Sequence, residues 1–254
     1  MFFDKKRGID NELKDAVISG DLDKLLELIN DGIDVDAQDE KGLSVVHYAI
    51  LNDRLDVLEV LIDTDANINL QDDAGVSPLH LASAYRSVEG VSMLLNANAD
   101  VSATDSWGLT PLHSAVLHCK ECEKSDENSK EIVKMLIENN ADPDVQNFMG
   151  HTALMDAICA GNMYGVKGYV DADAYLETKD NDGRTAFVYA LMKGNVEAIE
   201  LLVDAGVNVM TKDDKGNVAL RYAKNDETIN AVMKAYKKKK NDNNIDFSFL
   251  DMEF

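Results

Sequence analysis

The stretches AGVSPLHLA (residues 74–82) and WGLTPLHSA (residues 107–115) share the pattern G-x-[ST]-P-L-H-x-A, with their glycines 33 residues apart. Four further stretches match the pattern in part: KGLSVVHYA (41–49), MGHTALMDA (149–157), DGRTAFVYA (182–190) and KGNVALRYA (215–223). Successive glycines are separated by 33, 33, 42, 33 and 33 residues, so a 33-residue unit recurs and its third copy carries nine extra residues. Self-similarity at a fixed period of this length predicts a repeat architecture.

Each copy, numbered here as units one to six, has the same internal order. A turn containing Asp and Gly is followed by a short helix, a break and a second helix such as LDVLEVLID (55–63) or VEAIELLVD (196–204). One unit cannot bury its apolar stripe alone, but stacked units can, and this predicts an elongated solenoid. Residues 11–37 have the two helices without the preceding turn, which is typical of an N-terminal cap.

The motif around Gly75 and Gly108, together with the helices that follow it, resembles the ankyrin repeat, and the resemblance spans about residues 11–236. It implies an all-α ankyrin-repeat solenoid of helix-turn-helix units with β-turn finger loops, about six repeats plus an N-terminal cap. In that family the Ser or Thr and the His of the motif stabilise the turn, and the Pro begins the first helix. The residues expected to be scaffold are Ser77, Pro78, His80, Thr110, Pro111 and His113.

The resemblance also divides the chain. The expected segments are an N-terminal cap at 1–38, repeats at 39–71, 72–104, 105–146, 147–179 and 180–212, a C-terminal capping repeat at 213–240 and an acidic-aromatic tail at 241–254. The nine extra residues of unit three fall in a charged stretch without apolar periodicity, which predicts an inserted surface loop at 118–130.

The later units depart from the motif. Where His is expected, units four to six carry Met155, Val188 and Arg221. The second helix of unit four contains both Gly165 and Gly168, and glycine inside a helix costs about 1 kcal/mol relative to alanine. The sequence therefore predicts a soft or distorted fourth unit.

Charge limits the class of partner. The chain has 25 Lys and Arg against 47 Asp and Glu, a net charge of −22 spread over its length. Such a surface repels nucleic acid and anionic membranes and favours a partner protein with a basic surface. The alternative is that these acids serve turns and solvated helix faces and provide only solubility.

Three cysteines form no disulfide framework and the apolar run at the start is too short for a signal peptide, so we expect a cytoplasmic protein, monomeric when free.

A second interpretation concerns the cysteines. His118, Cys119 and Cys122 lie close in sequence, and with Cys159 they offer a candidate metal or redox site. Only three of the four ligands that tetrahedral zinc requires are local, so the preferred expectation is no metal and no cofactor. With the motif histidines assigned to the scaffold, no nucleophile, base and orienting group can be named together, and the sequence predicts a protein that is not an enzyme.

The resemblance places partner contacts on the concave face, at the turn tips beside the motif glycine and at the end of the first helix. At these positions the middle units carry the only Trp of the chain with Tyr, Phe and Met, whereas the flanking units are polar. The predicted partner-binding residues are Tyr85, Trp107, Leu109, Leu117, His118, Phe148, Met149 and His151. The alternative is that Trp107 and Phe148 pack onto neighbouring turns.

The function expected from these features is a non-catalytic protein–protein interaction module. An alternative is an acidic inhibitor, immunity or antitoxin-like protein that blocks a basic active site or nucleic-acid-binding surface. The tail alternates Ile245, Phe247 and Phe249 with polar residues, and it is expected either to bind a partner or to fold back on the solenoid.

Overall fold

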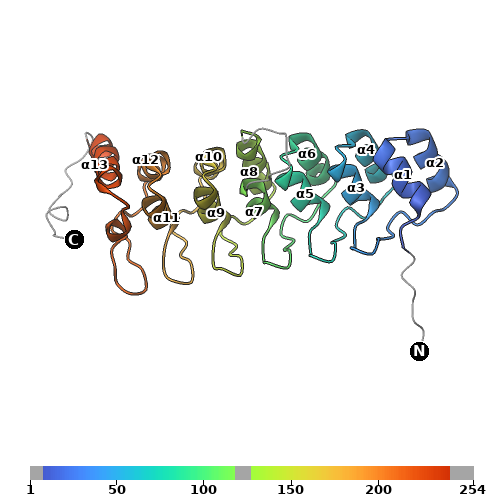
Figure 1. Cartoon of the computed structure of the whole chain (residues 1–254). Helices are drawn as coiled ribbons and strands as arrows, with labels where there is room; N and C mark the ends of the chain where they lie inside the picture. The colour runs from blue at the N-terminus through green and yellow to red at the C-terminus, as the bar shows by residue number, and fades with distance from the viewer. Residues whose placement is uncertain (1–7, 118–126, 241–254) are drawn as a thin grey trace, which may run out of the picture.

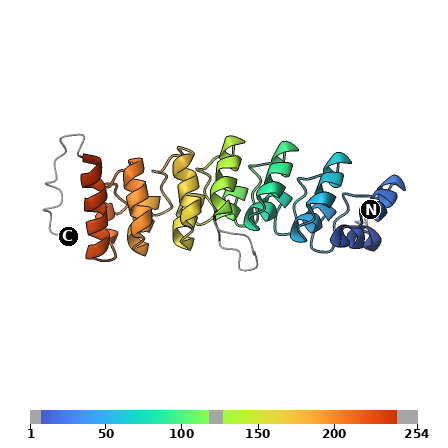
Figure 2. The same ribbon diagram turned by 90° about the horizontal axis from the view of Figure 1, so that it is seen from above.

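The computed structural model describes residues 8–117 and 127–240. In these parts thirteen α-helices and one 3-10 helix stand in a single row of antiparallel pairs, and the connecting loops project as fingers from one side (Figure 1). Seen from above, the row is elongated, with α1 and α2 at one end and α13 at the other (Figure 2). The expected all-α solenoid is therefore confirmed.

The helices alternate between a layer beside the fingers and an outer layer. The helices beside the fingers are α1 (Asn11–Ser19), α3 (Val45–Leu51), α5 (Pro78–Ala84), α7 (Pro111–Val116), α9 (Ala153–Ala160), α11 (Ala186–Lys193) and the 3-10 helix η1 (Ala219–Tyr222). The outer helices are α2 (Leu22–Asn30), α4 (Leu55–Asp63), α6 (Val88–Asn96), α8 (Asn128–Glu138), α10 (Met163–Asp171), α12 (Val196–Ala205) and α13 (Asp226–Lys240). Apolar side chains from both layers of every unit form one continuous core.

The motif histidines join consecutive units. In unit two, the His80 ring accepts the backbone N–H of Ser77 at Nδ1, 3.2 Å away, and its Nε2 lies 2.9 Å from the carbonyl oxygen of Leu109 in the next unit. His47 and His113 make the equivalent contacts in units one and three. Burial lowers the pKa of all three imidazoles, so they stay neutral with Nε2–H as the donor. The prediction that they are scaffold residues is confirmed.

The fingers also touch one another through their backbones. The N–H of Asp73 donates to the carbonyl of Lys41 at 3.0 Å, and the N–H of Ser106 donates to Ala74 at 2.8 Å. The motif glycine allows this approach: Gly42 has a φ of 77°, and a β-carbon there would lie 2.6 Å from the Asp73 nitrogen. The motif glycines therefore recur at the spacing of the contacts between neighbouring fingers.

The structure corrects the extent of the inserted loop. Helix α8 begins at Asn128, so residues 128–130 belong to a helix and not to the insertion expected at 118–130. The first turn of this helix is fixed because the buried Ser129 hydroxyl accepts hydrogen bonds from side chains of units two and four. Residues 118–126 lie outside the described part of the chain.

The structure also corrects the expected distortion of unit four. Helix α10 is an uninterrupted α-helix that contains both Gly165 and Gly168. A β-carbon on Gly165 would lie 2.8 Å from Cγ1 of Val116, and one on Gly168 would lie 3.0 Å from the carbonyl of Lys130. The glycines therefore let α10 pack closely against unit three, and this contact outweighs their low helix propensity.

Candidate protein-binding surface

Three large apolar side chains are exposed on the neighbouring fingers of units three and four. Trp107 is 70 % exposed, Phe148 74 % and Met149 66 %. The two fingers are joined directly, because the N–H of Phe148 donates to the carbonyl of Trp107 at 3.0 Å. These three side chains are called the apolar tip patch below.

Phe148 contacts the neighbouring turn and is exposed at the same time. Its ring lies against Gly108, where a β-carbon would be 3.0 Å from the ring atom Cδ1. The ring therefore packs onto the neighbouring turn, yet most of its surface still faces solvent. A side chain that is held in place and still exposed loses little conformational freedom when a partner covers it.

The tips on either side of the patch are polar. Exposed residues at the corresponding positions are Glu40 and Lys41 in unit one, Asp73 and the small Ala74 in unit two, Asn181 and Asp182 in unit five, and Asp214 and Lys215 in unit six. An apolar centre with a charged rim is the usual composition of an interaction surface.

Three of the other predicted residues are less accessible. Tyr85, Leu109 and Leu117 are half-buried, and the carbonyl oxygens of the two leucines accept hydrogen bonds from His80 and Arg86. His118 lies outside the described residues. The structure thus brings Trp107, Phe148 and Met149 together at the finger tips and places Tyr85, Leu109 and Leu117 further into the fold.

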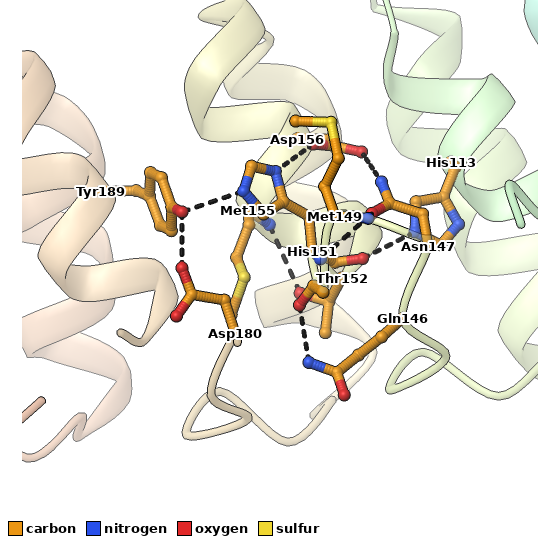
Figure 3. Close-up of polar contacts among 11 residues, drawn as sticks. His113, Gln146, Asn147, Met149, His151, Thr152, Met155, Asp156, Asp180 and Tyr189 are labelled. Carbon is orange, nitrogen blue, oxygen red and sulfur yellow. Dashed lines mark hydrogen bonds and ion pairs between the residues drawn. The ribbon is translucent and has the colours of Figure 1, made fainter. Parts of the chain in front are cut away.

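His151 occupies a polar network between units four and five rather than an open surface. Its side chain is 13 % exposed, and its Nδ1 lies 2.9 Å from Oδ1 of Asp156. Its Nε2 lies 2.9 Å from the hydroxyl of Tyr189, which donates to Oδ2 of Asp180 at 2.6 Å (Figure 3). The side-chain amide of Asn147 donates to the other oxygen of Asp156 at 3.0 Å.

A tyrosine–aspartate pair recurs along the same face of the solenoid. The hydroxyl of Tyr48 donates to Asp39 at 2.6 Å, and that of Tyr222 donates to Asp213. Burial alone would raise the pKa of Asp39, but hydrogen bonds from Tyr48 and from backbone N–H groups outweigh it and lower that pKa. These carboxylates are therefore engaged within the fold. In unit four the two positions carry Asn147 and Asp156 instead of Asp and Tyr.

Arg86 is a structural residue that the sequence analysis missed. It is 1 % exposed, and its guanidinium donates to Ser129 Oγ at 2.9 Å and to the Leu117 carbonyl at 3.3 Å. Asn162 donates to the Val116 carbonyl and to the same Ser129 hydroxyl. Together these side chains hold both ends of the inserted segment. The sequence does contain a signal: Arg86 stands where the corresponding positions of other units carry Gly20, Asp53, Gly161 and Gly194. All five residues have a positive φ, which an arginine rarely adopts.

The structure tests the metal hypothesis only in part. Cys119 and Cys122 lie outside the described residues, as does His118. Cys159 is half-buried, and burial raises the pKa of its thiol, which disfavours the thiolate that binds metals or reacts. Within residues 8–117 and 127–240, no three His, Cys, Asp or Glu side chains are grouped so as to hold a metal ion.

Comparisons with known proteins agree with this architecture. The sequence matches the family described as ankyrin repeats (3 copies) over residues 13–105, 119–213 and 164–244. The fold is similar to the ankyrin repeat domain of Bcl-3, a member of the IkappaB protein family, with a TM-score of 0.78 and 24 % identity over 89 % of this chain and 100 % of that domain. It is also similar to the human ASB11 ankyrin repeat domain, with a TM-score of 0.70 and 26 % identity over 89 % and 98 % of the two chains.

No curated protein sequence matches the chain. Among the described residues, every helix is too short or too polar to cross a membrane.

Proposed function

Because the chain belongs to the ankyrin-repeat family, whose repeats are protein–protein interaction modules, we propose that it binds a partner protein through the finger side of the solenoid. The apolar tip patch of Trp107, Phe148 and Met149 forms the centre of the contact. No catalytic step is part of this proposal.

The observation that carries the proposal is the grouping of the exposed side chains. Trp107, Phe148 and Met149 stand on two adjacent fingers that share a backbone hydrogen bond, while the neighbouring tips are polar. Aromatic side chains at the centre of an interface commonly supply most of its binding energy. The net charge of −22 and the exposed Asp73 on the adjacent tip favour a partner whose contact region has basic residues around an apolar centre.

The acidic-inhibitor alternative has weaker support because three acids on the finger side, Asp39, Asp180 and Asp213, stabilise turns within the fold. Each of them accepts a tyrosine hydroxyl and two backbone N–H groups. Other acids on the finger tips, such as Asp73 and Asp214, are exposed, so the salt dependence of binding decides between the two functions.

The test is capture of partners from native lysate, followed by affinity measurement with each captured protein. We expect Trp107→Ala and Phe148→Ala each to weaken binding by about 2 kcal/mol or more while thermal unfolding stays unchanged. Tyr175→Ala is the matched control, because Tyr175 is also exposed, at 63 %, but follows α10 and lies off the finger tips.

The proposal fails if the Trp107→Ala, Phe148→Ala double variant folds normally and keeps wild-type affinity. A partner that this variant retains but that high salt removes would support the acidic-inhibitor alternative instead.

A further inference from the structure

Side-chain amides link neighbouring fingers in most of the solenoid. Gln38, four residues before the motif glycine of unit one, donates from Nε2 to the carbonyl of Gly42 at 2.5 Å and to the carbonyl of Gln71 in the next unit at 2.8 Å. At the same position of their units, Gln71 and Gln146 make the same pair of hydrogen bonds at 2.6 to 2.9 Å. One amide nitrogen therefore bonds two carbonyl oxygens in each of these three links.

The link between units three and four has no such amide. The residue four positions before Gly108 is Thr104, which is exposed and too short to span two carbonyls. In the part of the chain that the structure describes, no side chain and no N–H of a loop donates to the carbonyl of Gly108 or to that of Gln146. Gly108 has a φ of 75°, close to the 77° of Gly42, so its finger turn has the same conformation.

These two carbonyls, called the acceptor pair below, border the apolar tip patch. Gly108 directly follows Trp107, and the ring of Phe148 lies against Gly108, 3.0 Å from the place of a β-carbon. Gln146 is exposed and stands two residues before Phe148 on the next finger. The acceptor pair and the patch therefore belong to the same two fingers, and a partner that covers the aromatic rings also approaches the carbonyls.

A partner that covers this surface has to supply a hydrogen-bond donor. A carbonyl oxygen that is removed from water without a donor destabilises the complex. In the other links the donor is an N–H2 group, whose two hydrogens reach the two carbonyls. The groups of a partner protein that match this geometry are planar and carry several N–H hydrogens, namely a carboxamide or a guanidinium.

Charge and aromatic neighbours favour the guanidinium. The chain has a net charge of −22, and Asp73 is exposed on the adjacent tip. A guanidinium is also attracted to aromatic faces, and Trp107 and Phe148 supply two of them beside the acceptor pair. A cation is already present at this position between units five and six, where the ammonium of Lys179 donates to the carbonyl of Lys212 at 2.9 Å. The finger link is thus compatible with a positive charge.

We propose that the acceptor pair and the apolar tip patch form one site that binds an arginine flanked by apolar residues on the partner protein. The guanidinium gives the carbonyls of Gly108 and Gln146 the hydrogen bonds that a glutamine gives elsewhere. The apolar neighbours of the arginine cover Trp107, Phe148 and Met149. The inference rests on the proposed function, because it names the chemistry of the partner at the same patch.

The test uses three matched peptides in which one central residue has a leucine and then a serine on either side. The central residue is arginine, citrulline, which keeps planar N–H donors without the charge, or norleucine, which has neither. Binding is followed by NMR through the indole N–H of Trp107, the only tryptophan of the chain. We expect the arginine peptide to bind about tenfold more tightly than the norleucine peptide, with the citrulline peptide between them.

Substitutions at Thr104 test the acceptor pair itself. Thr104→Gln places an amide where the other links have one, so we expect the Tm to rise and the Kd of the arginine peptide to increase about tenfold. Thr104→Arg, which carries a guanidinium of its own, should weaken the arginine peptide in the same way. Thr104→Val is the matched control, because it adds no donor, and it should leave the three affinities unchanged. The norleucine peptide should bind all four proteins equally.

Two results would overturn the inference: equal affinities of the arginine and norleucine peptides for the wild type, or an arginine-peptide affinity that both Thr104→Gln and Thr104→Arg leave unchanged. An absence of arginine-peptide binding would overturn it as well. Failure of the proposed function gives a different result. A norleucine peptide that binds as tightly as the arginine peptide and is lost in Trp107→Ala would keep the apolar tip patch as the site and exclude only the guanidinium.

Discussion

Units one to three are each closed onto the next unit by one buried histidine, whereas units four and five fill the same position with Met155 and Val188. In the first group the imidazole bonds both its own turn and the next unit. In the second group the position supplies apolar packing only, and the polar links, such as His151 to Tyr189, lie on the finger side. The same stacking is therefore compatible with two kinds of junction.

The two kinds of junction differ in how their stabilising free energy is distributed among side chains. A buried hydrogen-bonded ring joins several backbone groups through a single side chain, so its removal leaves those groups unsatisfied together. Apolar packing is shared among many weak contacts. Thr185 illustrates the contrast: its hydroxyl is buried without a hydrogen-bond partner in unit five, whereas the hydroxyl of Thr110 lies 2.9 Å from Nδ1 of His113. The polar half of the motif thus remains in unit five although its histidine is absent.

The largest expected effect is at Arg86, where the histidine-closed part of the solenoid meets the insertion. Arg86→Met should cost about 3 to 5 kcal/mol of unfolding free energy, because it removes the buried donors to the Leu117 carbonyl and to Ser129. The measurement is the urea midpoint with its slope. Arg54→Met is the control: Arg54 is half-buried and donates to one carbonyl, that of Ile18, so about 1 kcal/mol is expected.

The next effect tests the histidine junction itself. His80→Ala should cost about 2 to 3 kcal/mol, since it opens a cavity and leaves the N–H of Ser77 and the carbonyl of Leu109 without the ring. Equilibrium unfolding in urea measures this loss. A cost below about 1 kcal/mol would show that this junction depends on apolar packing, as in units four and five. The two groups of units would then not differ in what stabilises their junctions.

Acidification should separate the two groups of units. Because the folded pKa values of His47, His80 and His113 lie below the ordinary value, their contribution is present above about pH 6.5 and is lost as the pH falls through the folded values. Amide hydrogen exchange, corrected for its intrinsic pH dependence, should show protection declining first in α3, α5 and α7. Equal declines of protection in α9 and α11 would contradict the conclusion that the acid-sensitive junctions are those of units one to three.

The smallest effect sharpens the comparison within one residue type. Thr110→Val should cost about 1 kcal/mol, because it breaks the hydrogen bond to His113. Thr185→Val should cost nothing or stabilise slightly, since the Thr185 hydroxyl is buried without a partner. Differential scanning calorimetry measures the Tm of both variants. Equal shifts in Tm would show that the Thr110 hydroxyl contributes no more to stability than the Thr185 hydroxyl.

Most of the fold follows from the period of the sequence, because the motif glycines, the motif histidines and the helix patterns repeat in step with the contacts between units. Contacts that occur once leave no such trace. Arg86 reaches Ser129 across 43 residues, and His151 reaches Tyr189 across 38 with an imidazole at the position where unit five places Arg184 over the ring of Tyr222. The expected distortion of unit four was wrong for the same reason: Gly165 is unfavourable within its own helix, and only the close position of Val116 explains it.

For the candidate site, the exposure of the tip residues could be predicted, since it follows from their place beside the motif glycine. The location of His151 could not, although it stands next to Gly150, because its orientation depends on Asp156 and Tyr189. Neither residue is specified by the motif. Sequence position therefore identified the fingers, and side-chain partners decided which residues on them face solvent.

The hydrogen bonds among Arg86, Ser129 and Asn162 determine where the chain tolerates an insertion. Leu117 and Asn128 are fixed by contacts that do not involve the residues between them: the Leu117 carbonyl accepts from Arg86, and the Asn128 side-chain amide donates to the Arg86 carbonyl. Closing a longer segment between fixed ends adds only about 0.6 kcal/mol per doubling of its length. This position is therefore suited to grafted sequence, such as an epitope or a sensor domain, with little cost to the stack.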